Sequence, residues 1–153
     1  MTHVNLTAMA GAVVSDLETG IEQLGASVGS GALPTISADA LQMSQLLQNL
    51  IGNALKFHRP GESPVVKVSS TVTEVGQRLC HLVVEDNGIG FDEKYLDKIF
   101  QVFQRLHGRS EFEGTGIGLA ICRQIAERHG GSITARSEPD KGAKFIVTLS
   151  LED

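Results

Sequence analysis

The stretch VVEDNGIGFD, residues 83–92, joins an apolar strand to a polar loop that contains two glycines. The strand is predicted over residues 78–85, and Asp86 stands at its end. Gly88 and Gly90 allow the backbone to approach a ligand closely or to adopt a positive φ angle. The carboxylate of Asp86 could accept a hydrogen bond from an exocyclic amine such as that of adenine. Asp-Asn-Gly is also a common turn sequence, so this stretch alone leaves both interpretations open.

The next glycine-rich stretch is GTGIGLAI, residues 114–121, which opens a helix predicted over residues 116–129. Free amides and the helix dipole both favour an anion at such a helix start. The spacing is not that of the dinucleotide fingerprint, because Leu119 occupies the place of the third glycine and no parallel strand precedes the loop. No Gly-Lys-Ser/Thr sequence occurs, which excludes a P-loop. By itself this stretch supports phosphate binding only weakly.

A helix predicted over residues 38–57 carries the third informative stretch, QLLQNLIGNALKF. At about 100° per residue, Asn49, Asn53 and Lys56 fall within roughly 60° of one another, beside an apolar face that would pack in the core. A carboxamide oxygen suits one position around a water-rich Mg²⁺, and a lysine one turn further along can reach phosphate. A solvated polar face is the alternative interpretation of the same stripe.

Hydrophobic periodicity and turn residues assign the rest of the chain to further helices and strands. Ser37 is predicted to cap the helix over residues 38–57, with Asp39 near its positive end. The mixture of β-hairpins and helices predicts an α+β two-layer sandwich, with helices on one sheet face and one domain spanning residues 1–153. The other predicted segments are helices near 13–24 and before Phe100, and strands over 26–28, 33–36, 65–73, 132–137 and 144–151.

The composition carries no nucleic-acid or membrane signature. The 153 residues are 41% hydrophobic and 20% charged, and the net charge of −5 argues against a basic nucleic-acid-binding surface. Cys80 and Cys122 lie in apolar stretches without Cys-x-x-Cys spacing, which excludes a disulfide scaffold or zinc knuckle and suits a reducing compartment. No apolar run reaches about 18 residues and no signal pattern opens the chain, so we expect a cytoplasmic domain without membrane contact.

Taken together, the motifs resemble those of the catalytic and ATP-binding domain of bacterial sensor histidine kinases, in particular the phytochrome-like branch. The matching stretches, in chain order, are QNLIGNALKF, VEDNGIGFD, IFQVFQRLHGRSEFEGTGIGLAIC and RHGGSI with KGAKFIVTLSL. The resemblance runs from about residue 4 to the C-terminus. It implies a Bergerat-type fold, a mixed sheet backed by helices, with ATP held between loops at the sheet and a lid over about 101–115. We expect this lid to be poorly ordered without nucleotide.

The resemblance also assigns roles in holding ATP and Mg²⁺ to individual residues. The metal and phosphate roles fall on Asn53 as the Mg²⁺ ligand, on Asn49 and Lys56 as phosphate supports, on Arg105 at the γ-phosphate, and on the phosphate loop Gly114, Thr115, Gly116, Ile117 and Gly118. The adenine roles fall on Asp86 at the amino group, Thr148 through water, Gly88 and Gly90 making room for the base, and Phe57, Ile89, Ile99 and Leu119 as its walls.

Asn49 helps to distinguish this chain within the wider superfamily. Gyrase-type, chaperone and mismatch-repair ATPases are similar, but they usually place a glutamate one turn before the metal asparagine, as a base for water. A carboxamide cannot usefully take a proton at neutral pH. A histidine acceptor brings its own nucleophilic nitrogen, so positioning and charge neutralisation can suffice. Asn49 therefore favours phosphoryl transfer to histidine over water activation.

None of the five histidines has the acidic residue that follows the acceptor histidine in the family. They are His3, His58, His81, His107 and His129, the last expected to favour a helix C-terminus through the dipole. The resemblance therefore implies an acceptor on a separate dimerisation domain, followed by transfer to the aspartate of a response-regulator receiver domain. We expect the isolated domain to be monomeric. A stand-alone ATPase of the same superfamily and a non-catalytic nucleotide-sensing module remain the alternatives.

Overall fold

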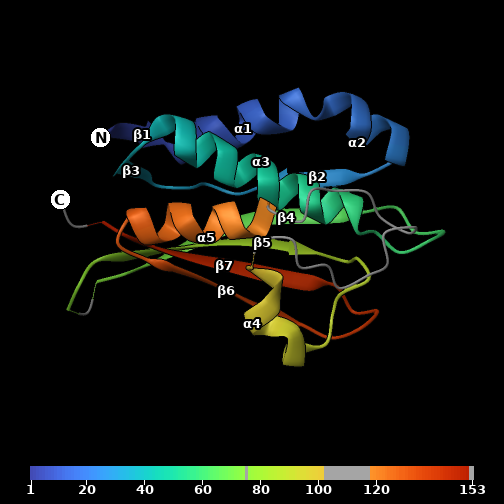
Figure 1. The fold of residues 1–153 in the computed structure, drawn as a ribbon. Helices are drawn as coiled ribbons and strands as arrows, with labels where there is room; N and C mark the ends of the chain where they lie inside the picture. Colours follow the sequence, from blue (N-terminus) through green and yellow to red (C-terminus); the bar gives the residue numbers. More distant parts are fainter. Residues whose placement is uncertain (75, 102–117, 152–153) are drawn as a thin grey trace.

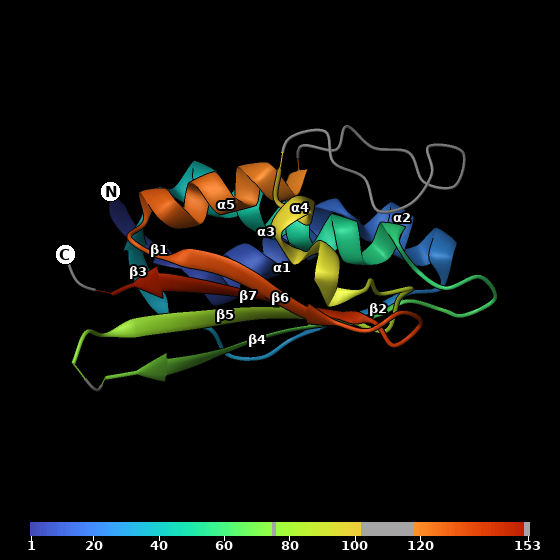
Figure 2. The same cartoon turned by 60° about the horizontal axis from the view of Figure 1, so that its bottom comes forward.

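Helices cover one face of a five-stranded sheet and leave its other face open (Figures 1 and 2). The computed structural model describes residues 1–74, 76–101 and 118–151. Only the pairing of β2 with β4 is parallel, and the other three pairings are antiparallel, so the sheet is mixed. The strand order is β2 (Ser27–Ser30), β4 (Val65–Thr73), β5 (Leu79–Asp86), β7 (Ala143–Ser150) and β6 (Ser132–Ser137).

The helical layer surrounds α3 (Ala40–Lys56), which crosses the sheet beside α5 (Gly118–Arg128) (Figure 2). The strands that precede α1 and α3 in the chain, β1 (Thr2–Asn5) and β3 (Thr35–Ala38), form a small antiparallel sheet. The other helices are α1 (Leu6–Asp16), α2 (Glu18–Leu24), the 3₁₀ turn η1 (Glu93–Tyr95) and α4 (Leu96–Ile99). This arrangement confirms the predicted α+β two-layer sandwich.

The core lies between the helices and the covered face of the sheet. Alternate residues of β5 and β7 are buried there, as period-two strands with one covered face require. The apolar face of α3 packs onto them, and this burial stabilises each large side chain by about 1.5–3 kcal/mol. The fully buried residues of these three elements include Met43, Leu46, Leu47, Ile51, Cys80, Leu82, Val147 and Leu149. Both cysteines are buried and free.

One local prediction, the N-cap of α3, is wrong. The N-cap of α3 is Asp39, whose carboxylate accepts from the amide of Gln42 at 2.9 Å, whereas Ser37 pairs with His3 in the small sheet. His129 is buried: its Nδ1 lies 2.7 Å from the Ile125 carbonyl, and its Nε2 accepts from the Asp39 amide at 3.1 Å. The ring thus joins the C-terminal end of α5, where the sequence placed it, to the start of α3.

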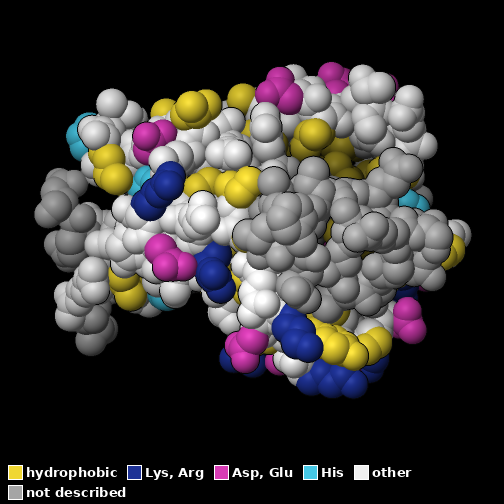
Figure 3. Space-filling model, viewed as in Figure 1, with side chains coloured by type: hydrophobic (Ala, Val, Ile, Leu, Met, Phe, Trp, Pro, Cys, Tyr) yellow, Lys and Arg dark blue, Asp and Glu magenta, His cyan; other side chains and the backbone are white. Residues whose placement is uncertain are grey.

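Charged side chains are spread over the face seen in Figure 3, with basic and acidic groups interspersed in its described part. This distribution is typical of a solvated surface. Within the described ranges, no helix combines the length and hydrophobicity needed to cross a bilayer.

Candidate functional site

Asp86 ends β5 with its side chain on the covered side of the sheet, in line with the buried Leu82 and Val84. Its Oδ1 accepts two backbone hydrogen bonds, from Gly88 at 2.8 Å and from Ala143 on β7 at 3.3 Å. The described residues donate no hydrogen bond to Oδ2, and none of their buried polar side-chain atoms lacks a partner, so Oδ2 must reach solvent. The two backbone amides therefore fix the orientation of the carboxylate, and Oδ2 is the oxygen that is left to accept from a ligand.

Burial raises the pKa of Asp86 from 3.8 to about 6. The two backbone hydrogen bonds oppose this shift because they favour the ionised form, while the neighbouring charge of Glu85 adds to it. A carboxylate with this pKa is ionised at neutral pH but is poorly solvated. An external hydrogen-bond donor at Oδ2 would therefore replace solvation that the folded chain does not provide.

The glycine loop after Asp86 packs against the backbone of two other segments. The Ile89 amide donates to the Phe57 carbonyl at the end of α3, at 2.9 Å. A β-carbon on Gly88 would collide with this same carbonyl, and one on Gly90, where φ is +65°, would collide with the Glu138 carbonyl. Both glycines are thus required by close backbone packing in this structure. Their predicted role of making room for a base is a separate matter, and it stays a prediction.

The polar stripe of α3 connects the start of α5 to the glycine loop. The carboxamide Nδ2 of Asn49 lies 3.5 Å from the Gly118 carbonyl at the first residue of α5. Asn53 and Lys56 follow on the same helix face, and from Asn49 to Lys56 the helix rises about 10 Å. The Lys56 ammonium lies 5.9 Å from the centre of the Phe57 ring. The stripe therefore spans the space between a helix N-terminus, which favours anions, and the loop that holds Asp86.

The donor set around Asn53 fits a magnesium ion that is held mainly by other ligands. Asn53 is half-buried and offers one neutral carboxamide oxygen. The described residues contain no group of three or more His, Cys, Asp or Glu side chains placed to hold a metal. One hard oxygen without a protein cage suits Mg²⁺ whose remaining ligands are phosphate oxygens and water.

The comparisons with known proteins agree with this arrangement. A family model described as "Histidine kinase-, DNA gyrase B-, and HSP90-like ATPase" matches residues 38–153. The chain belongs to this ATPase family. The resemblance to sensor histidine kinases is confirmed by relatives and by solved structures of histidine kinase catalytic domains.

Among the relatives, the phytochrome-like protein Cph1 of Synechocystis sp. is 37% identical over 151 residues, which covers 99% of this chain and 20% of that protein. Cyanobacterial phytochrome A of Nostoc sp. is 43% identical over 136 residues, covering 89% of this chain and 17% of that protein. The chain thus spans about a fifth of the length of these relatives. The nucleotide-free catalytic domain of histidine kinase ThkA is 27% identical with a TM-score of 0.80, covering 98% of this chain and 97% of that one.

The fold of the ATPase family brings most of the described candidate residues to one end of the sheet. Asn49, Asn53, Lys56 and Phe57 come from α3, and Asp86, Gly88, Ile89 and Gly90 come from β5 and its loop. Leu119 is half-buried on α5, and Ile99 on α4 is buried in the core beside Phe100, whose ring packs edge-on against Phe145. The predictions for Arg105, Gly114, Thr115, Gly116, Ile117, Phe103, His107 and the lid fall on residues 102–117, outside the described residues.

Thr148 is not part of this arrangement. Asp86 pairs with Ala143 at one end of β7, and Thr148 lies five residues further along, about 17 Å away at 3.4 Å per residue. Its side chain is on the open face of the sheet, where its Oγ1 lies 3.1 Å from Nδ1 of His81. The expected contact of Thr148 with adenine, shared with Asp86, is therefore corrected: on β7 it is the backbone of Ala143 that meets Asp86.

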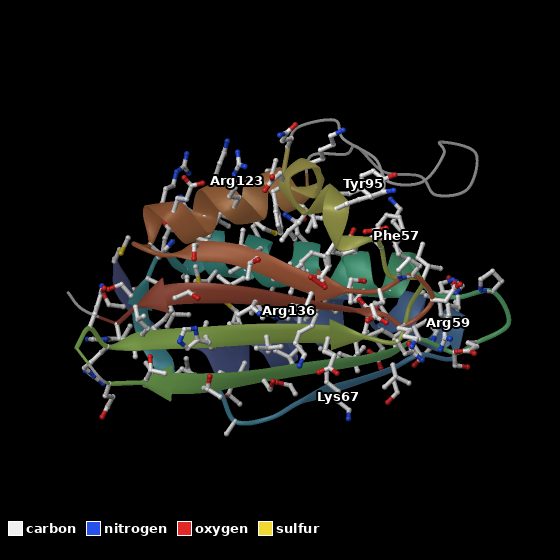
Figure 4. All side chains as sticks on the ribbon, turned by 90° about the horizontal axis from the view of Figure 1, so that it is seen from below. Phe57, Arg59, Lys67, Tyr95, Arg123 and Arg136 are labelled. Carbon is white, nitrogen blue, oxygen red and sulfur yellow. The ribbon has the colours of Figure 1, made fainter. Side chains whose placement is uncertain are left out.

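Sequence reasoning missed the residues that support the glycine loop from outside. Arg59 donates from Nε to the Asn87 carbonyl and from one Nη to the Asp140 carbonyl, both at 3.0 Å. The Asn87 side chain accepts from the Val65 amide at 2.8 Å. Figure 4 shows Arg59 at the same end of the molecule as Phe57. The partners of Arg59 are 28 and 81 positions away in the chain, so the spacing of nearby residues could not predict these contacts.

Proposed function

We propose that this chain is the catalytic and ATP-binding domain of a protein-histidine kinase. It binds ATP with Mg²⁺ and supplies the γ-phosphate for autophosphorylation of a histidine on a separate dimerisation domain, in two-component signal transduction. The observation that supports this most strongly is Asp86, a buried carboxylate whose Oδ1 is held by two backbone amides while Oδ2 stays accessible. Family membership supports the nucleotide as ATP.

Adenine recognition would fall to Asp86. The carboxylate only accepts hydrogen bonds, so it pairs with the 6-amino group of adenine and repels the 6-oxo group of guanine or hypoxanthine. Phe57 and Ile89 lie beside it, joined through the Ile89 amide and the Phe57 carbonyl, and provide apolar contact for the base. This division of roles gives affinity from the ring contacts and specificity from one charged acceptor.

Phosphate binding would fall to α3 and the start of α5. Asn53 would hold Mg²⁺ through its carboxamide oxygen, and the ion would supply charge neutralisation for the phosphates. Lys56 would add a point charge, and the amides at the start of α5, near Gly118, would favour the anion through the helix dipole. Arg105, Gly114, Thr115 and Gly116 would complete the γ-phosphate end.

Asn49 supports histidine as the acceptor. Its Nδ2 lies 3.5 Å from the Gly118 carbonyl, and a carboxamide offers no base that could activate water. The acceptor nucleophile must then come from another domain, because no histidine of this chain precedes an acidic residue. The phosphohistidine would pass its phosphoryl group to a response-regulator receiver domain. Relatives such as the aerobic respiration control sensor protein ArcB of Escherichia coli support a signalling role.

The experiment is a phosphotransfer assay in trans. The purified chain, ATP and Mg²⁺ are mixed with a histidine-bearing dimerisation domain, and acid-labile phosphohistidine is measured, with Asp86→Asn and an acceptor-free mixture as controls. The proposal predicts phosphohistidine only when the acceptor is present, and much less of it with Asp86→Asn than with the unsubstituted chain. Rapid phosphate release without acceptor would instead support a stand-alone ATPase. Binding without either product would support a nucleotide-sensing module.

A further inference from the structure

The Arg59 guanidinium joins three separate segments of the chain. Its Nε donates to the Asn87 carbonyl and one Nη donates to the Asp140 carbonyl, both at 3.0 Å. Its other Nη forms an ion pair with Glu62 in the loop that follows α3. The side chain is 32% exposed, less than that of Glu62 at 49%, so the guanidinium lies between these segments rather than on top of them.

Two of these segments provide the amides that orient Asp86. Asn87 directly follows Asp86 and precedes Gly88, whose amide donates to Oδ1. Asp140 lies in the turn that leads into Ala143, whose amide donates to the same oxygen. The two segments also meet each other, because the Asp140 amide donates to the Ile89 carbonyl at 2.6 Å. Arg59 therefore contacts the backbone directly before one donor of the carboxylate, Gly88, and three residues before the other, Ala143.

The turn between β6 and β7 depends on such outside contacts. Asp140 has φ of 63°, a left-handed conformation that costs a residue with a side chain about 1 kcal/mol or more. Such a conformation persists only where surrounding contacts enforce it. A planar guanidinium can donate to two carbonyls at once in a fixed geometry, which an ammonium cannot do. The fork of Arg59 is thus suited to fixing the distance between the glycine loop and this turn.

We infer that Arg59 is a positioning residue for adenine recognition: it braces the two backbone segments whose N–H groups aim the Asp86 carboxylate. This inference rests on the proposed function, because it concerns how the same site selects its base. It assigns Arg59 no contact with nucleotide. The ion pair with Glu62 is partly exposed and contributes little, so the two carbonyl bonds carry the role.

The test compares ATP with ITP, which carries a 6-oxo group in place of the 6-amino group and is otherwise nearly the same ligand. Both are titrated calorimetrically, with Mg²⁺, against the unsubstituted chain and Arg59→Gln. We expect Arg59→Gln to lower ATP affinity by roughly three- to tenfold, because a charge-assisted contact is weakened but not removed, while ITP affinity stays within about twofold. The ATP-to-ITP ratio is a readout that a general loss of stability would not move.

Two matched variants control for charge and for the ion pair. Glu62→Gln removes the ion pair but leaves both carbonyl bonds, and Arg123→Gln removes an arginine from an exposed pair with Glu127 on α5 (Figure 4). Both should keep the ATP-to-ITP ratio of the unsubstituted chain. Arg59→Lys keeps the charge without the fork, so its ratio should fall as in Arg59→Gln, and it serves as the test should Arg59→Gln not fold.

Several outcomes overturn the inference. An unchanged ratio in Arg59→Gln, an equal loss of both affinities, or a full rescue of the ratio by Arg59→Lys would each show that the fork does not position Asp86. Failure of the proposed function is distinguishable, because the unsubstituted chain would then bind ATP no better than ITP. In that case there is no selectivity for Arg59 to support, and the inference is overturned as well.

Discussion

Replacing Asp86 with asparagine is expected to stabilise the fold and to weaken ATP binding at the same time. The ionised carboxylate is held in a poorly solvated place, and its pKa of about 6 compares with 3.8 for an ordinary aspartate. Asparagine keeps an oxygen to accept from Gly88 and Ala143, and its amide takes the accessible position of Oδ2. The variant therefore removes the buried charge without leaving either backbone donor unpaired.

The size of the effect follows from linkage. One pKa unit corresponds to 1.36 kcal/mol, so a shift of about two units makes ionised Asp86 destabilising by at most ~3 kcal/mol. Below pH 3.8 the carboxyl is protonated in the folded and unfolded chains alike, and no penalty exists. Between about pH 4 and 6 the unfolded chain ionises while the folded chain keeps its proton, so stability falls. Above about pH 6 the penalty is complete.

The assay is urea unfolding of both proteins at pH 5 and pH 8. We expect Asp86→Asn to raise the free energy of unfolding by about 1–3 kcal/mol at pH 8, and by less at pH 5. Glu85→Gln is the matched control, because it removes the same charge one residue earlier, from a side chain that is 50% exposed and paired with Lys144. Its effect should stay within about 0.5 kcal/mol.

The same variant should bind ATP about 30-fold or more weakly, since a charged acceptor is replaced by a donor that faces the adenine amine. The reasoning is refuted if Asp86→Asn is no more stable than the unsubstituted chain at pH 8. It is also refuted if the gain is larger at pH 5 than at pH 8.

Three further perturbations test other parts of the site and its support. Gly142→Ala should cost more than about 1 kcal/mol of stability in urea unfolding, since φ is +81° and a β-carbon would collide with the Asp86 carbonyl; an unchanged midpoint would contradict this. His129→Phe should cost about 1–3 kcal/mol in the same assay, because the Asp39 amide loses its buried acceptor; a neutral effect would mean that water replaces the ring. Asn53→Ala should reduce calorimetric ATP affinity roughly tenfold with Mg²⁺ but little without it, and equal losses would argue against a metal ligand.

The sequence predicted most of the secondary structure because hydrophobic periodicity is local. The helix predicted over residues 38–57 is observed as Ala40–Lys56, and the strands over 65–73 and 132–137 have the observed bounds. The last strand was placed one residue late, at 144–151 rather than Ala143–Ser150. That one residue matters, because Ala143 is the partner of Asp86.

What could not be predicted depends on contacts between distant parts of the chain. Ser37 resembles a helix cap locally, but it is paired with His3 in a strand. The sequence places Thr148 in the last strand but does not give the register of β7 against β5. That register sets both the distance of Thr148 from Asp86 and the sheet face on which its side chain lies. Arg59 follows a helix in an unremarkable loop, and its contacts appear only when the turn at Asp140 is folded beside it.

The central claim is that one site, between α3, the glycine loop and α5, binds ATP with Mg²⁺. The most direct test is to titrate the ¹⁵N-labelled chain with ATP and Mg²⁺ and to follow the backbone amide resonances. The account predicts saturable shifts, at one ATP per chain, that centre on Gly88, Ala143 and Gly118, and that Asp86→Asn weakens. No saturable shifts, or shifts centred on the open face around His81 and Thr148, would contradict it.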